Sequence, residues 1–208
     1  MAKRDLKKLR RDLYGPPKEP VLVQVPPLDY LMIDGEGDPN TSEWFQMATE
    51  ALYAVGYSIK FMVKAQDAAL DFVVPPLEGL WWAEDMSAFD LRLPGKRHDK
   101  SDWLWTLMIM MPEPVDEAIY RAGHEAACAR KCLVAADEMR FEGLEEGSSA
   151  QVMHIGPYDA EGPTVARLHK FIAEQGHAPR GKHHEIYLSD PRRAAPEKLR
   201  TVIQQPVA

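Results

Sequence analysis

The sequence predicts an α+β fold in which two pseudo-symmetric βαββ repeats form one antiparallel sheet, with helices on one face and a ligand cleft on the other. Strand-like and helical segments follow one another as strand, helix, strand, strand, and this order occurs twice. The two copies also share local similarity, since residues 31–35 resemble 152–156 and residues 106–112 resemble 201–206. A hydrophobic content of 45% with 27% charged residues is typical of a globular chain with a substantial core.

Residues 1–20 are expected to form a basic N-terminal arm, and residues 21–208 a single domain. Six of the 25 basic but only two of the 32 acidic side chains lie in residues 1–12, which leaves 19 basic against 30 acidic side chains in the rest. An acidic body argues against nucleic acid and favours a neutral or cationic ligand. The leucines of the arm have helical spacing, so we expect an exposed, partly helical segment, with binding to phosphate or an anionic surface as the alternative. The charged start and the lack of a long apolar run predict a cytoplasmic protein without a membrane partner.

The first repeat covers about residues 28–112. Its helix has an apolar face at helical spacing from Phe45 to Met62, and a polar turn before it supplies an N-cap. The following strand is entered through the break at Pro75 and Pro76. The elements expected are strands at residues 21–25, 30–37, 72–84 and 102–111, with a helix at 43–63.

A helical segment at residues 113–147 connects the repeats, and the second repeat covers residues 148–208. Its helix ends at Gly176, and its middle strand ends at Asp190 and Pro191 because proline cannot donate to a sheet ladder. The elements expected are one or two helices within residues 115–140, strands at 149–156, 183–189 and 201–207, and a helix at 161–174.

Glu185 is the leading candidate for a functional side chain, because it is a carboxylate in a strand of aromatic and apolar residues. Alternation along the strand places His183, Glu185 and Tyr187 on one face, and His184 and Ile186 on the other. The two histidines therefore cannot bind one metal ion together with Glu185. Loss of hydration among aromatic side chains is expected to raise the pKa of Glu185.

Glu78 is the expected counterpart of Glu185 in the first repeat, because residues 77–81 align with residues 184–188. We expect both carboxylates on the open face of the sheet, where tryptophans from two adjacent strands wall the cleft. The predicted ligand-binding residues are Glu78, Tyr187, Trp82, Trp103 and Trp105, with Trp81 on the same two strands. The alternatives are tryptophans that belong to the core, and glutamates that are solvated or pair with Lys60, Arg192 or Arg193.

No motif indicates a metal or a cofactor. The GxGxxG, P-loop, GxSxG and HExxH patterns do not occur, so nucleotide binding and triad or zinc-dependent hydrolysis lack support. His124, Cys128 and Cys132 share a helical face and are the alternative metal cluster. A closed zinc site usually needs a fourth ligand, so we expect these residues to pack a helix and the protein to use no cofactor.

Four segments resemble the GyrI-like small-molecule-binding domains, which share the fold of the effector domains of multidrug-responsive bacterial transcription activators. The segments are residues 30–39, 76–82, 153–158 and 183–193, which are spread over almost the whole chain after residue 20. The last one is similar to a stand-alone subgroup without a DNA-binding domain, and no helix-turn-helix precedes the body here. The resemblance implies a cleft between the repeats, a cleft glutamate matching Glu185, and a monomer or homodimer that binds small molecules. Within the matching segments, Tyr158 and His154 are further candidates for the site.

The resemblance also implies a reaction, because some stand-alone members hydrolyse the cyclopropane ring of DNA-alkylating natural products as a detoxification. In such a reaction Glu185 would act as general base on water, and Tyr158 or Tyr187 would donate a hydrogen bond to the dienone oxygen. Flat hydrophobic or cationic molecules are the expected ligands. Two other functions remain open: a multidrug-binding or sequestering protein without chemistry, and a protein–protein inhibitor of a topoisomerase.

Overall fold

The computed structural model describes residues 3–83 and 100–208. In this part of the chain, eight strands form one antiparallel sheet in the order β1-β6-β8-β7-β3-β4-β2-β5. The strands are β1 (Val21–Val25), β2 (Leu28–Glu36), β3 (Glu78–Trp82), β4 (Leu104–Met111), β5 (Arg140–Leu144), β6 (Gly147–Ile155), β7 (His183–Tyr187) and β8 (Arg200–Pro206). The helices are α1 (Leu6–Leu9), α2 (Arg11–Tyr14), α3 (Glu43–Gln66), α4 (Glu117–Cys128) and α5 (Gly162–Glu174).

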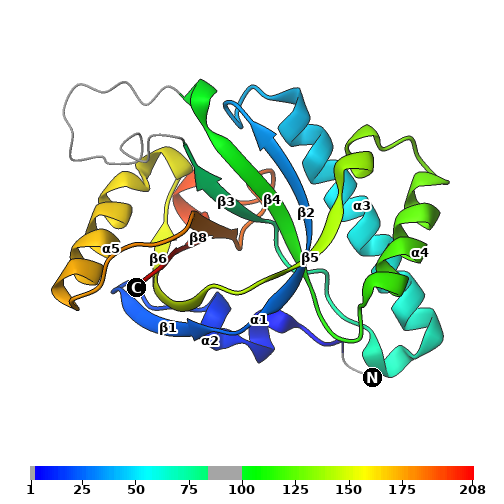
Figure 1. Cartoon of the computed structure of the whole chain (residues 1–208), viewed down its shortest axis with the longest axis horizontal. Coiled ribbons are helices and arrows are strands. Elements are labelled where there is room, and N and C mark those ends of the chain that lie inside the picture. The colour runs from blue at the N-terminus through cyan, green and yellow to red at the C-terminus, as the bar shows by residue number, and fades with distance from the viewer. Residues whose placement is uncertain (1–2, 84–99) are drawn as a thin grey trace.

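Six of the eight strands belong to two βαββ units that meet at the strand pair β3–β7, and β1 and β5 are the two edge strands (Figure 1). The first unit is β2, α3, β3 and β4, and the second is β6, α5, β7 and β8. At the junction, Gly79 lies opposite Glu185 and Leu80 lies opposite His184. The predicted α+β fold, with two βαββ repeats in one antiparallel sheet, is therefore confirmed.

Helices α3 and α5 each cover the strands of their own repeat. Ser42 caps α3 by accepting the N–H of Phe45, and the buried face of this helix packs on β2 and β4. Leu168 and Ile172 of α5 pack on Val152 and Ile203 of the second repeat. Figure 1 shows the two helices toward opposite ends of the sheet, with β3 between them.

The opposite face of the sheet is covered by the N-terminal arm, which corrects the expectation of an exposed arm and an open face. Leu13 and Tyr14 are 3% and 4% exposed, and they belong to a core cluster with Met108 and Ile186. Gln151 of β6 donates a hydrogen bond to the carbonyl of Leu13 at 3.1 Å. Of the leucines with helical spacing in the arm, Leu6 and Leu13 thus pack on the sheet and Leu9 stays exposed. Any open site must lie on the side of α3 and α5.

The connecting segment at residues 113–147 contains a helix, as the sequence predicts, but also a strand that the sequence does not predict. Residues 115–140 contain α4 and a short 3-10 turn at Val134–Glu138, and the chain then enters β5, which pairs with β2. The apolar residues of β5, Phe141 and Leu144, are three positions apart, so the segment lacks the alternation that marks a half-buried strand.

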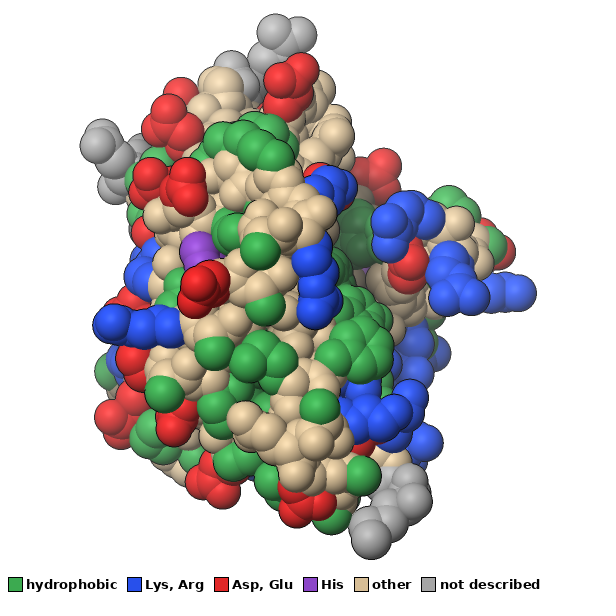
Figure 2. Space-filling model, turned by 90° about the vertical axis from the view of Figure 1, so that its right-hand side faces the viewer, with side chains coloured by type: hydrophobic (Ala, Val, Ile, Leu, Met, Phe, Trp, Pro, Cys, Tyr) green, Lys and Arg blue, Asp and Glu red, His purple; other side chains and the backbone are tan. Residues whose placement is uncertain are grey.

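The side of the molecule formed by α3 and α4 carries exposed aromatic rings. Tyr57 and Phe61 of α3 are 48% and 54% exposed, and their rings stack with centroids 6.4 Å apart. Figure 2 shows hydrophobic side chains gathered in the middle of this side, with Lys and Arg side chains along its margin. None of the helices within residues 3–83 and 100–208 combines the length and the apolar character that a membrane crossing requires.

Candidate functional site

The two faces of β7 carry different chemistry, as strand alternation predicts. Glu185 and Tyr187 lie on the same face as Trp81, between the helices α3 and α5. His184 and Ile186 lie on the other face, below the N-terminal arm. Glu185 therefore belongs to the side of the sheet that the arm leaves uncovered.

A chain of hydrogen bonds holds the Glu185 carboxylate in place. His183 Nε2 lies 3.2 Å from Oε1, and the Tyr187 hydroxyl donates to Oε2 at 2.8 Å. The Trp81 indole N–H in turn donates to the Tyr187 oxygen at 3.0 Å. Gly79 makes this approach possible, because a Cβ there would lie 2.8 Å from Trp81 Nε1. The side chain of Glu185 keeps 16% of its surface exposed, so solvent or a ligand reaches it.

Glu161 is a second carboxyl at this site, and the sequence analysis missed its role. It directly precedes α5, is only 6% exposed and lies within hydrogen-bonding reach of Glu185. Burial, followed by the negative charge of Glu185, raises the pKa of Glu161 to about 9. At neutral pH Glu161 is therefore the protonated member of the pair.

The pKa of Glu185 is shifted down, against the expectation of a raised value. Burial alone would raise it, but the hydrogen bond and positive charge of His183, the Tyr187 hydroxyl and protonated Glu161 outweigh that effect. Two neighbouring carboxyls whose pKa values are pushed apart are the usual basis of an acid and base assignment. Glu185 is the base form of this pair, and Glu161 is the acid form.

Tyr158 lies beside this pair, as the sequence predicts. Its ring meets the Tyr187 ring edge to face with centroids 5.6 Å apart, and 38% of Tyr158 is exposed. Burial of the hydroxyl, followed by the charges of Glu161 and Glu185, raises the pKa of Tyr158 to about 12. The Tyr158 hydroxyl thus keeps its proton at neutral pH and is available as a donor at the rim of the site.

The predicted tryptophans are distributed over three environments. Trp105 is fully buried, packs edge-on against Phe45 and lies over Gly35, so it belongs to the core. Trp82 is on the arm side of β3, where the Lys182 ammonium lies 3.2 Å from its ring centroid. Trp103 contacts Trp81 edge-on at 5.7 Å and is the one of the three that remains next to the site. The expectations for Trp82 and Trp105 are therefore corrected, because the strand register decides the face and the sequence does not reveal it.

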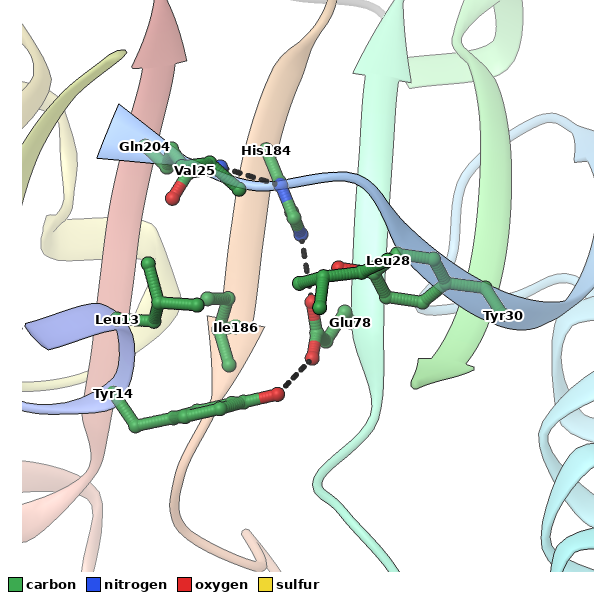
Figure 3. Close-up of a pocket in the computed structure, with 9 residues that line it drawn as sticks. All are labelled: Leu13, Tyr14, Val25, Leu28, Tyr30, Glu78, His184, Ile186 and Gln204. Atoms are coloured by element: carbon green, nitrogen blue, oxygen red, sulfur yellow. Dashed lines mark hydrogen bonds and ion pairs between the residues drawn. The ribbon is translucent and has the colours of Figure 1, made fainter. Parts of the chain in front are cut away.

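Glu78 does not share a face with Glu185, so the predicted pairing is wrong. Glu78 is 1% exposed and sits below the arm, where the Tyr14 hydroxyl donates to it at 3.1 Å and His184 Nε2 donates at 3.0 Å (Figure 3). His184 Nδ1 donates to Glu146 at 3.0 Å. Burial would lower the pKa of His184, but the two carboxylates outweigh it and raise the value to about 10. The result is a buried imidazolium between two glutamates.

This buried cluster has little room for a ligand. The cavity between Glu78, His184, Tyr14 and their neighbours has a volume of about 10 Å³, which suits a single water molecule. Figure 3 shows Tyr14 and His184 pointing toward Glu78 from either side. The cluster therefore joins the arm to β3 and β7 and serves stability.

The remaining candidates have structural partners. His154 lies between the Thr164 hydroxyl at 3.0 Å and the Pro157 carbonyl at 3.2 Å, and so ties β6 to the start of α5. Cys128 Sγ is 4.0 Å from the His124 ring, and burial raises the pKa of its thiol. Across the residues that the structure describes, no group of three or more metal-binding side chains comes together. Lys60 and Arg192 pair with Asp71 and Asp190 rather than with either glutamate.

The comparison with protein families decides the relationship. The model of the GyrI-like small molecule binding domain matches residues 18–208. The chain belongs to the GyrI-like family. A comparison with curated proteins finds no significant match.

Solved structures of GyrI-like relatives support this assignment. An uncharacterized conserved protein from Listeria innocua is 40% identical with a TM-score of 0.87, over 99% of this chain and 100% of that one. Two proteins described as hydrolases from the same organism are 37% and 38% identical, with TM-scores of 0.84 and 0.85, over 99% and 100% of this chain and the full length of theirs. The C-terminal domain of EcmrR, 11% identical with a TM-score of 0.53 over 91% of this chain and 97% of that one, shares the fold alone.

Chemically, the site of this GyrI-like domain combines a base, a neutral acid and aromatic rings. Ionised Glu185 accepts a proton, while Glu161 and Tyr158 are donors at neutral pH. The partly buried Trp103 adds apolar surface beside them, whereas Trp81 is 4% exposed and belongs to the core cluster behind the site. Such a site suits a flat molecule that is attacked by water, or a cation that is held by the carboxylate.

Proposed function

We propose that this GyrI-like domain binds flat hydrophobic small molecules at the Glu185 site and hydrolyses cyclopropanoid-type cytotoxins there, as a detoxification in the cytoplasm. The observation that carries the proposal is a carboxylate that His183 and Tyr187 hold ionised, directly beside a protonated second carboxyl. The two relatives described as hydrolases support it, because each matches essentially the whole chain.

Glu185 acts as the general base in this proposal. A water molecule beside it transfers a proton to Glu185 while the water oxygen attacks the CH₂ carbon of a cyclopropane conjugated to a dienone. A C–O bond forms, the strained C–C bond breaks, and its electron pair moves to the dienone oxygen. The low pKa of Glu185 makes it a modest base that is fully ionised at neutral pH, and general base catalysis of this kind contributes about 10²–10⁴-fold in rate.

Tyr158 is the better candidate for the hydrogen bond to the dienone oxygen. The Tyr187 hydroxyl already donates to Glu185, so its role is to position the base. The Tyr158 hydroxyl has a pKa of about 12 and lies at the exposed rim, where a ligand enters. A donor at this point stabilises the negative charge that develops on the oxygen as the ring opens.

The test is product analysis by mass spectrometry after incubation with a spirocyclopropyl dienone. Wild-type protein is expected to yield a product heavier by one water, and Glu185→Gln to lose this activity while ligand-induced tryptophan fluorescence changes persist. Gln has the same shape but cannot accept the proton. Unreduced hydrolysis by Glu185→Gln would remove Glu185 from the catalytic role.

A non-catalytic binding protein is the second candidate. The observation in its favour is an ionised carboxylate near the exposed aromatic ring of Tyr158, an arrangement that holds organic cations through charge and cation–π contacts. In that case the incubation leaves the dienone unchanged, and Glu185→Gln weakens the binding of a cationic dye. Loss of cation binding without any hydrolysis by the wild type would decide for this candidate.

A further inference from the structure

Backbone hydrogen bonds fix the position of Glu161 at the start of α5. Its backbone N–H donates to the Tyr158 carbonyl at 3.2 Å, and its own carbonyl accepts from Thr164 at 2.8 Å and Val165 at 3.0 Å. The chain is thus held on both sides of Glu161 by the turn before α5 and by the first turn of that helix. Its side chain is directed to the sheet rather than to solvent, since only 6% of the residue is exposed.

Two buried polar atoms at this position make no hydrogen bond of good geometry among the described residues, although the Thr201 hydroxyl lies near enough to Glu161 to lower the pKa of its carboxyl. They are Glu161 Oε1 and the hydroxyl oxygen of Thr201. Thr201 is fully buried, and it lies opposite Tyr187 in one strand pair and opposite His154 in the other. It therefore shares the face of the sheet that carries Tyr187 and Glu185. Buried polar atoms without partners are rare and usually mark a place where a water or a reacting group binds.

The neighbouring carboxyls also have the arrangement that suits a bound water. Glu161 and Glu185 lie within hydrogen-bonding reach of each other, and the charges of two such close carboxylates would repel strongly. The pair therefore holds one proton, and that proton resides on Glu161, which is 6% exposed, whereas the side chain of Glu185 is 16% exposed. Ionised Glu185 can then accept a proton from water. Neutral Glu161 can donate or accept a hydrogen bond without changing its own charge.

We infer that Glu161 is a second catalytic residue, whose neutral carboxyl and the Thr201 hydroxyl hold the attacking water against Glu185. This inference rests on the proposed function and adds the water-binding part of the site. The water donates one proton to Glu185 and uses its oxygen to open the ring. Glu161 keeps its proton throughout, and Glu185 afterwards releases the proton it has gained to solvent.

The inference predicts an unusual pattern among substitutions of Glu161. Gln is neutral and has a donor and an acceptor, so Glu161→Gln is expected to hydrolyse the dienone faster than Glu161→Ala. Glu161→Ala removes the water contact, and we expect a loss of about 100-fold, the size typical of a misplaced reactant. Thr201→Val, which removes only the hydroxyl, is expected to lose about 10-fold, in line with the loss of one hydrogen bond to a reacting group. Asp159→Asn, an exposed carboxyl in the same turn, is the matched control and should match the wild type.

The pH profile separates this role from a merely structural one. Ionisation of Glu161 near pH 9 would place a second negative charge at the site, so wild-type hydrolysis should fall above about pH 9. Glu161→Gln has no such group, and its activity should persist to higher pH. Infrared titration supplies a readout without substrate: a protonated-carboxyl band should disappear near pH 9 in the wild type and be missing in Glu161→Gln.

The outcomes distinguish the two proposals. A wild type that opens no spirocyclopropyl dienone would refute the proposed function, and the inference with it. Hydrolysis by Glu161→Ala at the wild-type rate, or an alkaline loss of activity retained in Glu161→Gln, would refute the role of Glu161 and leave the proposed function standing.

Discussion

Glu185 and Glu78 lie on neighbouring strands of the same sheet, yet they face opposite sides and meet opposite conditions. On the arm side, Glu78 shares the charge of His184 with Glu146, and all three side chains are closed off from solvent. On the helix side, Glu185 faces a carboxyl that has to stay protonated, and part of its surface stays open. Opposite charges that pair with each other stabilise a fold, whereas two carboxyl groups held close together are typical of a functional site. The partner of a carboxylate, rather than its sequence context, therefore separates a structural from a functional role.

The largest effect on stability is expected on the arm side. His184→Leu leaves two buried carboxylates without their cation, and breaking a buried ion pair costs about 3–5 kcal/mol. His183→Leu, the neighbouring position on the other face, removes one hydrogen bond to a partly exposed carboxylate and should cost about 2 kcal/mol or less. Urea unfolding at neutral pH measures both. Equal losses for the two variants would contradict the assignment of the faces.

The two faces should also differ in how their stability depends on pH. The pKa of His184 is raised from 6.5 to about 10, so its stabilisation is complete below pH 6.5 and is lost as pH rises through about 10. The pKa of Glu161 is raised from 4.5 to about 9. Burying this carboxyl in its neutral form therefore costs nothing below pH 4.5, and it lowers the free energy of unfolding increasingly between pH 4.5 and about pH 9. Glu161→Gln removes that penalty, and its melting temperature should exceed the wild-type value by an amount that grows between about pH 4.5 and pH 9.

The measurement is a series of thermal melts of wild type, Glu161→Gln and His184→Leu across this pH range. The gap between wild type and His184→Leu should narrow only above pH 6.5. A Glu161→Gln variant that is less stable than the wild type at pH 9 would show that Glu161 stabilises the fold at this pH rather than destabilising it.

A smaller pair of effects compares one tyrosine hydroxyl on each face. Tyr14→Phe removes the donor to Glu78 and should cost about 1–2 kcal/mol in stability with no change in hydrolysis. Tyr187→Phe removes the donor to Glu185, so the pKa of that carboxylate rises and the acid limb of the rate profile moves to higher pH. Chemical unfolding and pH–rate profiles on both variants test the comparison. An acid limb that shifts in Tyr14→Phe would contradict the assignment of Tyr14 to a purely structural role.

Much of the fold could be predicted from the sequence, because it depends on local periodicity. The helical face of α3 and the alternation along β7 are encoded in consecutive residues, and both repeats follow from such patterns. The packing of the arm could not be predicted, since Leu6, Leu13 and Tyr14 are buried only through contact with distant strands. Short helices of four residues carry too little local signal to reveal that contact.

The site could be predicted only in part for a related reason. Glu185, Tyr158 and Tyr187 were expected together, and the structure brings them together. The register between β3 and β7 places Glu78 opposite Ile186 rather than beside Glu185, and a shift of one residue exchanges the faces. Glu161 was invisible as a site residue because its partner lies 24 positions away in another element. The one sequence signal is a carboxylate shortly after Tyr158 at the start of a helix.

Hydrolysis of a spirocyclopropyl dienone by Glu185→Gln and Glu78→Gln, measured per folded molecule, shows on which face of the sheet the chemistry takes place. Both substitutions remove one negative charge from adjacent strands at nearly constant shape. We predict that Glu185→Gln loses at least about 10²-fold in rate, whereas Glu78→Gln is less stable but turns over like the wild type. A Glu185→Gln variant that remains active, or a folded Glu78→Gln variant that does not, would contradict the claim that the chemistry resides on the helix side of the sheet.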